Sequence, residues 1–295
     1  MDGNKAEVEV SKFESRLLGR KDKFRGFQEV QGQAVSELRE HLGIYLFGVR
    51  TFHYEGSPRL ATIRRKLGAL DDRAGKFIED PTHRGFYDSD QDAVFMKPDD
   101  HFAEIHELGH AFQEKSSPGL VELYINGRMG AEGVNERVAA KAMEEGMAQW
   151  MAVATSFLTQ DPEKVKEAIL ENNKLVADMN ASEGFNYDPK VVAQKLATVK
   201  GMIADYAKIP ALQKSGNPIV AQENYVTLLK NFDFYRGLMS LGYVYTMARL
   251  ADESQSGRRT SDVLRDLTKT PPTLAEIEEK VSGFNGQVDF GNVRV

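Results

Sequence analysis

Residues 106–110 read His-Glu-Leu-Gly-His and match the pattern HExxH. On a helix, His106 and His110 project from one face, one turn apart. Two imidazoles at this spacing can bind one Zn²⁺ at ~2.0–2.1 Å each. Glu107 follows the first histidine, where its carboxylate can take a proton from a water at the metal. The motif therefore indicates metal-assisted hydrolysis, with two metal ligands and a general base.

The residues around the motif favour the helix that it requires. Pro98 is followed by Asp99 and Asp100, whose side chains can cap the start of a helix. The histidines lie beside a stripe of apolar residues with helical spacing, Phe102, Ile105, Leu108 and Phe112. The alternative is a solvated helix that carries two histidines by chance.

A catalytic zinc site uses three protein ligands and keeps one position open. The chain has 6 histidines and none follows His110, so a downstream carboxylate is the simplest third ligand. Glu145 is the best candidate, because its side of a predicted helix is largely apolar and a buried carboxylate needs a partner. The alternative for Glu145 is a salt bridge at the edge of the core. Glu144 shares its stripe with Arg137 and Lys141, which predicts a solvated, charge-paired face.

The motif, followed 35 residues after His110 by Glu145-Gly146-Met147-Ala148, resembles the gluzincin group of zinc metallopeptidases. The resemblance implies Zn²⁺ held by His106, His110 and Glu145, with Glu107 as the general base. Glu144 stands where the aminopeptidase branch of that group has Asn.

A tyrosine is the expected second donor to the oxyanion formed during peptide hydrolysis. Tyr235-Arg236-Gly237 resembles a Tyr-x-x-Gly segment of gluzincin aminopeptidases, with a spacing one residue shorter. Tyr235 is the first candidate for this role and Tyr243 the second. For either residue a packing role is the alternative. Tyr245 lies on an apolar line and is expected in the core. The segment 270–277 also resembles a gluzincin-like signature, and its Thr273 and Glu276 predict a helix capping box.

The resemblance implies an α+β, zincin-like fold. Residues 1–115 are predicted to form a lobe with a small mixed sheet and the motif helix, and residues 116–295 a mainly helical lobe that carries the third ligand. The resemblance also implies that the strand just before the motif helix, at 93–96, is an exposed edge to which a substrate peptide can add. The patterns predict a hairpin around 88–92, strands at 44–54 and 75–79, and helices at 27–42, 135–158, 162–179, 189–207, 218–231, 233–251, 260–268 and 273–281.

Composition bounds the class of protein. A hydrophobic content of 41% and a charged content of 28% are ordinary for a soluble globular chain. The net charge of -6 argues against a nucleic-acid surface. Without cysteine the chain has no disulfides and no thiol nucleophile. No apolar run has the length of a membrane span or a signal peptide, so we expect a cytoplasmic protein without membrane contact.

These observations predict a zinc metallopeptidase that acts on a peptide or protein. One alternative is a zincin-like binding or regulatory protein with little turnover. Another is a metal hydrolase that cleaves a bond other than a peptide bond. Peptide specificity and oligomeric state are not encoded in any motif that we recognise.

Overall fold

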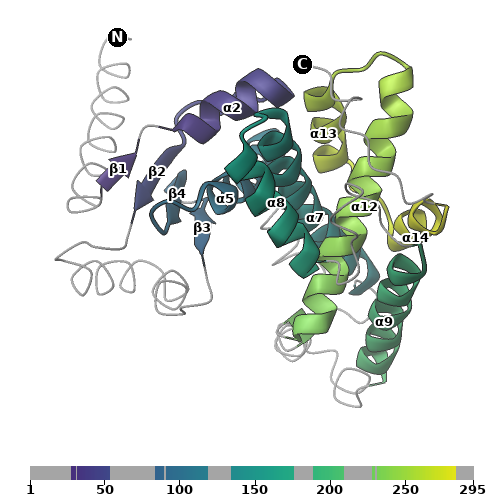
Figure 1. The fold of residues 1–295 in the computed structure, drawn as a ribbon. Coiled ribbons are helices and arrows are strands. Elements are labelled where there is room, and N and C mark those ends of the chain that lie inside the picture. The colour runs from purple at the N-terminus through teal and green to yellow at the C-terminus, as the bar shows by residue number, and fades with distance from the viewer. Residues whose placement is uncertain are drawn as a thin grey trace, which may run out of the picture.

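The computed structural model describes residues 28–30, 32–53, 84–89, 91–118, 134–175, 189–208, 228–229 and 231–283. Over these ranges the protein is a mixed α+β structure, mostly helical, with one small sheet (Figure 1). The strands are β1 (Gln28–Val30), β2 (Arg50–His53), β3 (Gly85–Asp88) and β4 (Ala93–Met96). The helices are α2 (Gln33–Leu42), α5 (His101–Ser116), α7 (Val134–Leu158), α8 (Pro162–Leu175), α9 (Pro189–Ala207), α12 (Phe232–Gln255), α13 (Thr260–Lys269) and α14 (Leu274–Ser282).

The sheet has the strand order β1-β2-β4-β3 and is mixed. Strand β1 pairs antiparallel with β2, β2 runs parallel to β4, and β3 and β4 form the predicted antiparallel hairpin. The prediction that residues 93–96 form the edge is wrong, because β4 lies between β2 and β3. All four residues of β4 are buried, whereas those of β3 are half-buried. The unbroken apolar run Ala-Val-Phe-Met is typical of a strand covered on both faces.

Helix α5 packs on the sheet and carries the motif. Asp100 caps its first turn, because the carboxylate accepts a hydrogen bond from the backbone N–H of Ala103 at 3.0 Å. Val94 and Met96 of β4 join Ile105 and Leu108 of α5 in the hydrophobic core. The opposite face of the sheet has a row of stacked rings, Phe86, Phe95 and Phe52.

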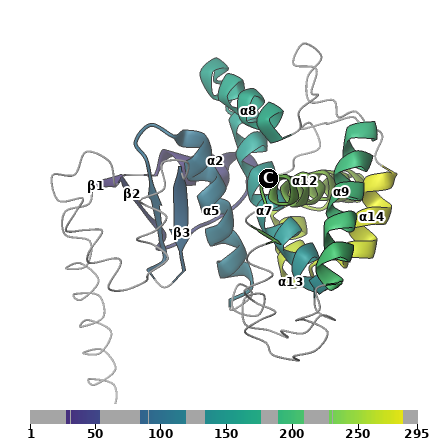
Figure 2. The ribbon, with the colours of Figure 1, turned by 90° about the horizontal axis from the view of Figure 1, so that it is seen from below.

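Helix α7 lies between α5 and α12, as Figure 2 shows. Two glycine contacts bring these helices unusually close. A Cβ atom on Gly109 would lie 2.9 Å from the Cα of Ala148, and one on Gly146 would lie 2.2 Å from the carbonyl carbon of Gly242. The contact at Gly109 sets the separation between α5 and α7, and the contact at Gly146 sets the separation between α7 and α12. Both glycines are next to candidate ligands in sequence, His110 and Glu145.

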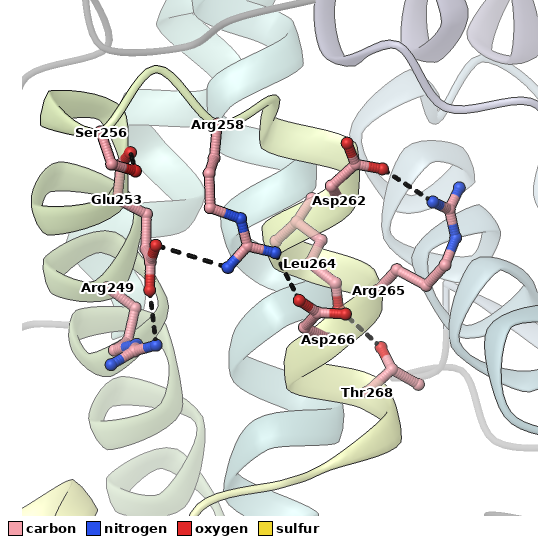
Figure 3. Close-up of polar contacts among 9 residues, drawn as sticks. All are labelled: Arg249, Glu253, Ser256, Arg258, Asp262, Leu264, Arg265, Asp266 and Thr268. Carbon is pink, nitrogen blue, oxygen red and sulfur yellow. Dashed lines mark hydrogen bonds and ion pairs between the residues drawn. The ribbon is translucent and has the colours of Figure 1, made fainter.

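Polar contacts stabilise the C-terminal helices α12, α13 and α14. Arg258, in the turn after α12, binds Glu253 of α12 and Asp266 of α13 (Figure 3). The predicted capping box is confirmed, since the side chain of Thr273 accepts from the N–H of Glu276 and the Glu276 carboxylate accepts from the N–H of Thr273. One cluster of buried hydrophobic side chains includes residues on both sides of the predicted lobe boundary at 115 and 116.

Several predicted elements differ in extent from those observed. The helix predicted from residue 27 begins at Gln33, because residues 28–30 pair with β2 instead. The strand predicted at 44–54 is confined to residues 50–53 within the described part. The strand predicted at 75–79 and most of the helix predicted at 218–231 lie outside the described residues. Among the described helices, none is long and apolar enough to cross a bilayer.

A polar cluster joins α2, α5 and α8 away from the motif histidines. The Glu37 carboxylate binds His101 Nε2 at 2.6 Å and the ammonium of Lys164. Burial acts to raise the pKa of Glu37, but Lys164 and His101 outweigh it, so this pKa lies below its usual value. Burial holds the pKa of His101 below its usual value, against the effect of Glu37. His101 therefore belongs to a polar cluster separate from the motif histidines.

We expect Glu37→Gln to lower the free energy of unfolding by ~2 kcal/mol at pH 7, because buried partners lose a charged acceptor. A lowered carboxyl pKa contributes stability that is present above pH ~4.3 and lost as the pH falls through the folded value. Because the pKa of His101 is lowered in the folded protein, protonation of the unfolded chain adds a further loss of stability as the pH falls below ~6.5. Urea unfolding from pH 8 to pH 3 should therefore show a shallower decline in the variant below pH ~4.3, where Glu37 no longer titrates. Between pH ~6.5 and ~4.3 the decline should be steeper, because Glu37 no longer raises the pKa of His101. Glu40→Gln, at an exposed site on the same helix, should match wild type; equal declines in all three proteins would contradict the prediction.

Candidate metal centre

Two helices bring three potential ligands together. His106 and His110 lie one turn apart on α5, and Glu145 lies on the facing side of α7. Their ligand atoms all lie within 4.8 Å of one another, and in the described part of the chain this is the group of histidine and acidic side chains that can hold a metal ion. The imidazole rings are 4.9 Å apart between centroids and nearly perpendicular. The sequence therefore predicts correctly that Glu145 meets both histidines.

The separations suit a tetrahedral metal. Glu145 Oε2 lies 3.5 Å from His106 Nε2 and 3.8 Å from His110 Nε2. Ligands at 2.0–2.1 Å from a tetrahedral ion are ~3.4 Å apart, so the two distances from Glu145 lie within a few tenths of an ångström of that spacing. Two imidazoles and one carboxylate are also the ligand types found in zinc hydrolases. The residues present therefore fit a divalent metal.

Lys141 is a member of this centre that the sequence analysis places wrongly. Its ammonium lies 2.8 Å from Glu145 Oε1 and 3.0 Å from Glu144 Oε2. The predicted charge pairing on this face is confirmed by the ion pair between Lys141 and Glu144, but the face is not solvated as predicted, because Arg137 is buried and the side chains of Lys141 and Glu144 are each 24% exposed. The spacing of four residues between Lys141 and Glu145 is the signal that identifies this pair on a helix.

The charged side chains around Glu145 shift one another's pKa values. Burial acts to raise the pKa of Glu145, but Lys141 and the two histidines outweigh it, so this pKa lies well below its usual value. Burial acts to lower the pKa of Lys141, but Glu144 and Glu145 raise it well above its usual value. For His106, burial is outweighed by Glu145 and Glu107, so its pKa is raised. Glu145 is thus an ionised carboxylate, as metal binding requires.

Polar side chains surround the two histidines and could orient their rings. Gln149 hydrogen-bonds to His106. The Nδ1 atom of His110 is buried without a hydrogen-bond partner and lies 4.0 Å from Glu144 Oε1. The amide of Gln113 donates to the carbonyl of Glu144 at 2.8 Å, which ties α5 to α7 beside the site. Metal-ligating histidines usually donate their second ring N–H to a carboxylate or carbonyl, and Glu144 is the carboxylate near this atom, though beyond hydrogen-bond distance.

The two candidate tyrosines occupy different places. Tyr235, on α12, hydrogen-bonds to Glu145, and its pKa lies well above the usual value because of burial and the Glu145 charge. Tyr243 is fully buried in the hydrophobic core where α7 and α12 cross. Tyr245 is buried in the same core, as predicted. The structure brings Tyr235 to the candidate metal group and assigns Tyr243 a packing environment.

Glu107 faces the beginning of strand β3. A Cβ atom on Gly85 would lie 3.3 Å from Glu107 Cγ. The glycine thus lets the backbone of β3 pass close to this carboxylate. Among the described residues, β3 pairs on one side only, with β4, so its other side is an edge of the sheet next to Glu107.

Comparisons with protein-family models, with curated proteins and with solved structures gave no match to this chain.

Proposed function

We propose that this protein is a zinc-dependent metallopeptidase of gluzincin type with a zincin-like fold. The observation that carries the proposal is the convergence of His106 and His110 with Glu145 from a second helix. Two imidazoles and a carboxylate leave a fourth tetrahedral position open, which distinguishes a catalytic zinc site from a closed structural one. Zinc when bound would polarise a carbonyl group and lower the pKa of water.

The protein side chains would perform the proton transfers. Glu107 would accept a proton from the attacking water and later deliver it to the leaving nitrogen. Tyr235 would move its hydroxyl hydrogen bond from Glu145 to the oxyanion as charge develops there. Its raised pKa keeps the hydroxyl protonated and therefore able to donate.

The sheet edge supports a peptide as the substrate. Among the described residues β3 pairs with β4 alone, so an extended chain could add to its other side. Its first residue, Gly85, lies against Glu107, so a peptide bound along β3 would pass the general base. In this proposal β3 has the role that the sequence analysis gives to residues 93–96.

A second candidate function is a zincin-like binding or regulatory protein with little turnover. The ion pair between Lys141 and Glu145 favours it, because it gives the buried carboxylate a partner without a metal. The two candidates differ in metal content and in peptide hydrolysis.

The direct test is elemental analysis of purified wild type beside Glu145→Ala and Glu145→Gln. We expect about one zinc per chain in wild type and a large loss in both variants, because three protein ligands define the site. The Gln variant keeps the volume of the side chain, so its folding can be compared with wild type by circular dichroism.

Glu136→Gln is the matched control, since it removes an exposed carboxylate at the start of the same helix. It should retain zinc. A wild-type protein that stays free of metal after zinc is supplied would overturn the proposal and leave the binding protein as the better candidate. Zinc retained by both Glu145 variants would move the third ligand elsewhere.

A further inference from the structure

Lys141 occupies a position that the reaction outlined above does not use. It lies on α7, three residues before Glu144 and four before Glu145, so its side chain reaches both carboxylates along one face of the helix. Its ammonium takes Oε1 of Glu145 at 2.8 Å and Oε2 of Glu144 at 3.0 Å.

The oxygen atoms that Lys141 does not bind both face histidines. Glu145 Oε2 is the atom near His106 Nε2 and His110 Nε2, at 3.5 Å and 3.8 Å. Glu144 Oε1 is the atom nearest His110 Nδ1, at 4.0 Å. Each carboxylate is thus divided, with one oxygen toward the ammonium and the other toward an imidazole.

We propose that Lys141 positions the metal centre by holding one oxygen of each carboxylate, so that Glu145 offers the metal a single oxygen and Glu144 orients His110. The inference rests on the proposed metal site and adds a residue that fixes its geometry. A carboxylate can bind a metal through one oxygen or both, and an ammonium on Oε1 favours the single-oxygen mode. A carboxylate beside the second nitrogen of a ligating histidine fixes the ring and makes it a better ligand.

A competing effect has the opposite sign. An ammonium near a divalent cation repels it, and removing the ammonium would then strengthen metal binding. In wild type two carboxylates neutralise Lys141, whereas its removal leaves Glu144 and Glu145 as adjacent like charges without the ammonium that binds one oxygen of each. We therefore expect the loss of orientation to outweigh the relief of repulsion.

The test compares Lys141→Met with wild type by zinc titration against a competing chelator and by the visible absorption of bound Co²⁺. Loss of an outer-shell residue typically weakens metal binding 10–100-fold, and we expect a loss of ~10–100-fold here. The Co²⁺ absorption should lose intensity, because a freed Glu145 carboxylate can bind through both oxygens and raise the coordination number above four. Neither readout depends on peptide hydrolysis.

Two further variants separate positioning from folding. Lys141→Arg should recover much of the affinity, because a guanidinium can also bind two carboxylates. Glu144→Gln keeps the ion pair between Lys141 and Glu145, so it should weaken zinc binding without changing the Co²⁺ spectrum. If Lys141→Met does not fold, Lys141→Arg and Glu144→Gln provide the test. A change in the Co²⁺ spectrum of Glu144→Gln would then contradict the inference that Glu144 orients His110 and does not affect how Glu145 binds the metal. Lys166→Met, at an exposed site on α8, is the control for loss of a positive charge.

Wild-type affinity and an unchanged Co²⁺ spectrum in Lys141→Met would overturn the inference while leaving the metal site intact. Tighter zinc binding in that variant would also overturn it, since repulsion would then dominate. Failure of wild type itself to bind zinc would instead reject the proposed function, and the inference with it.

Discussion

Glu107→Gln is expected to lower the rate of peptide hydrolysis ~10²–10⁴-fold while the protein keeps its zinc. The size follows from the usual contribution of a positioned general base. The amide of Gln cannot accept the proton of the attacking water, yet it has nearly the volume of the carboxylate. Glu107 is not part of the His106, His110 and Glu145 group, so the metal ligands stay unchanged. The measurement is turnover of a peptide library together with zinc content.

The control for this variant is again Glu136→Gln, whose exposed carboxylate lies outside the site. It should hydrolyse peptides at the wild-type rate. Equal rates for Glu107→Gln and wild type would reject Glu107 as the base. Loss of zinc from Glu107→Gln would show instead that Glu107 supports the metal site.

Gly146→Ala is expected to lower the free energy of unfolding by at least ~3 kcal/mol, the upper part of the range for overpacked cores. The added methyl group would lie 2.2 Å from backbone atoms of Gly242 and Tyr243, which no side-chain rotation can relieve. Helices α7 and α12 would have to separate. Glu145 precedes Gly146 on α7 and Tyr235 lies on α12, so the contact between Glu145 and Tyr235 should weaken when the helices separate. Zinc binding by Glu145 should weaken as well. Urea unfolding and zinc content measure the two effects.

Gly201→Ala is the matched control for this glycine. It lies in the interior of α9, and a Cβ atom there would meet nothing within 4 Å. The change should raise stability by ~0.5–1 kcal/mol, because alanine is the better helix former. Wild-type stability in Gly146→Ala would mean that the two helices do not cross at this contact.

Local sequence patterns were enough to predict most of the elements that carry the site. The motif helix with its Asp100 cap, the hairpin before it and the Thr273 capping box follow from interactions within a few residues. The pairing of Glu145 with the motif was also predictable. A glutamate on an apolar helix face needs a partner, and two histidines earlier in the chain could provide one through a shared ion.

The remaining features depend on which distant segments pack together. The order of the strands is set by the pairing of β2 with β4, so the edge next to Glu107 is β3 and not residues 93–96. The choice between Tyr235 and Tyr243 is set by the crossing of α7 and α12 at Gly146 and Gly242. The sequence alone predicted the candidate metal ligands and the helices that carry them, because spacing and burial act locally along the chain. Only the tertiary structure decided that β3 is the edge of the sheet next to Glu107 and that Tyr235, not Tyr243, lies beside Glu145, because each depends on contacts between separate elements.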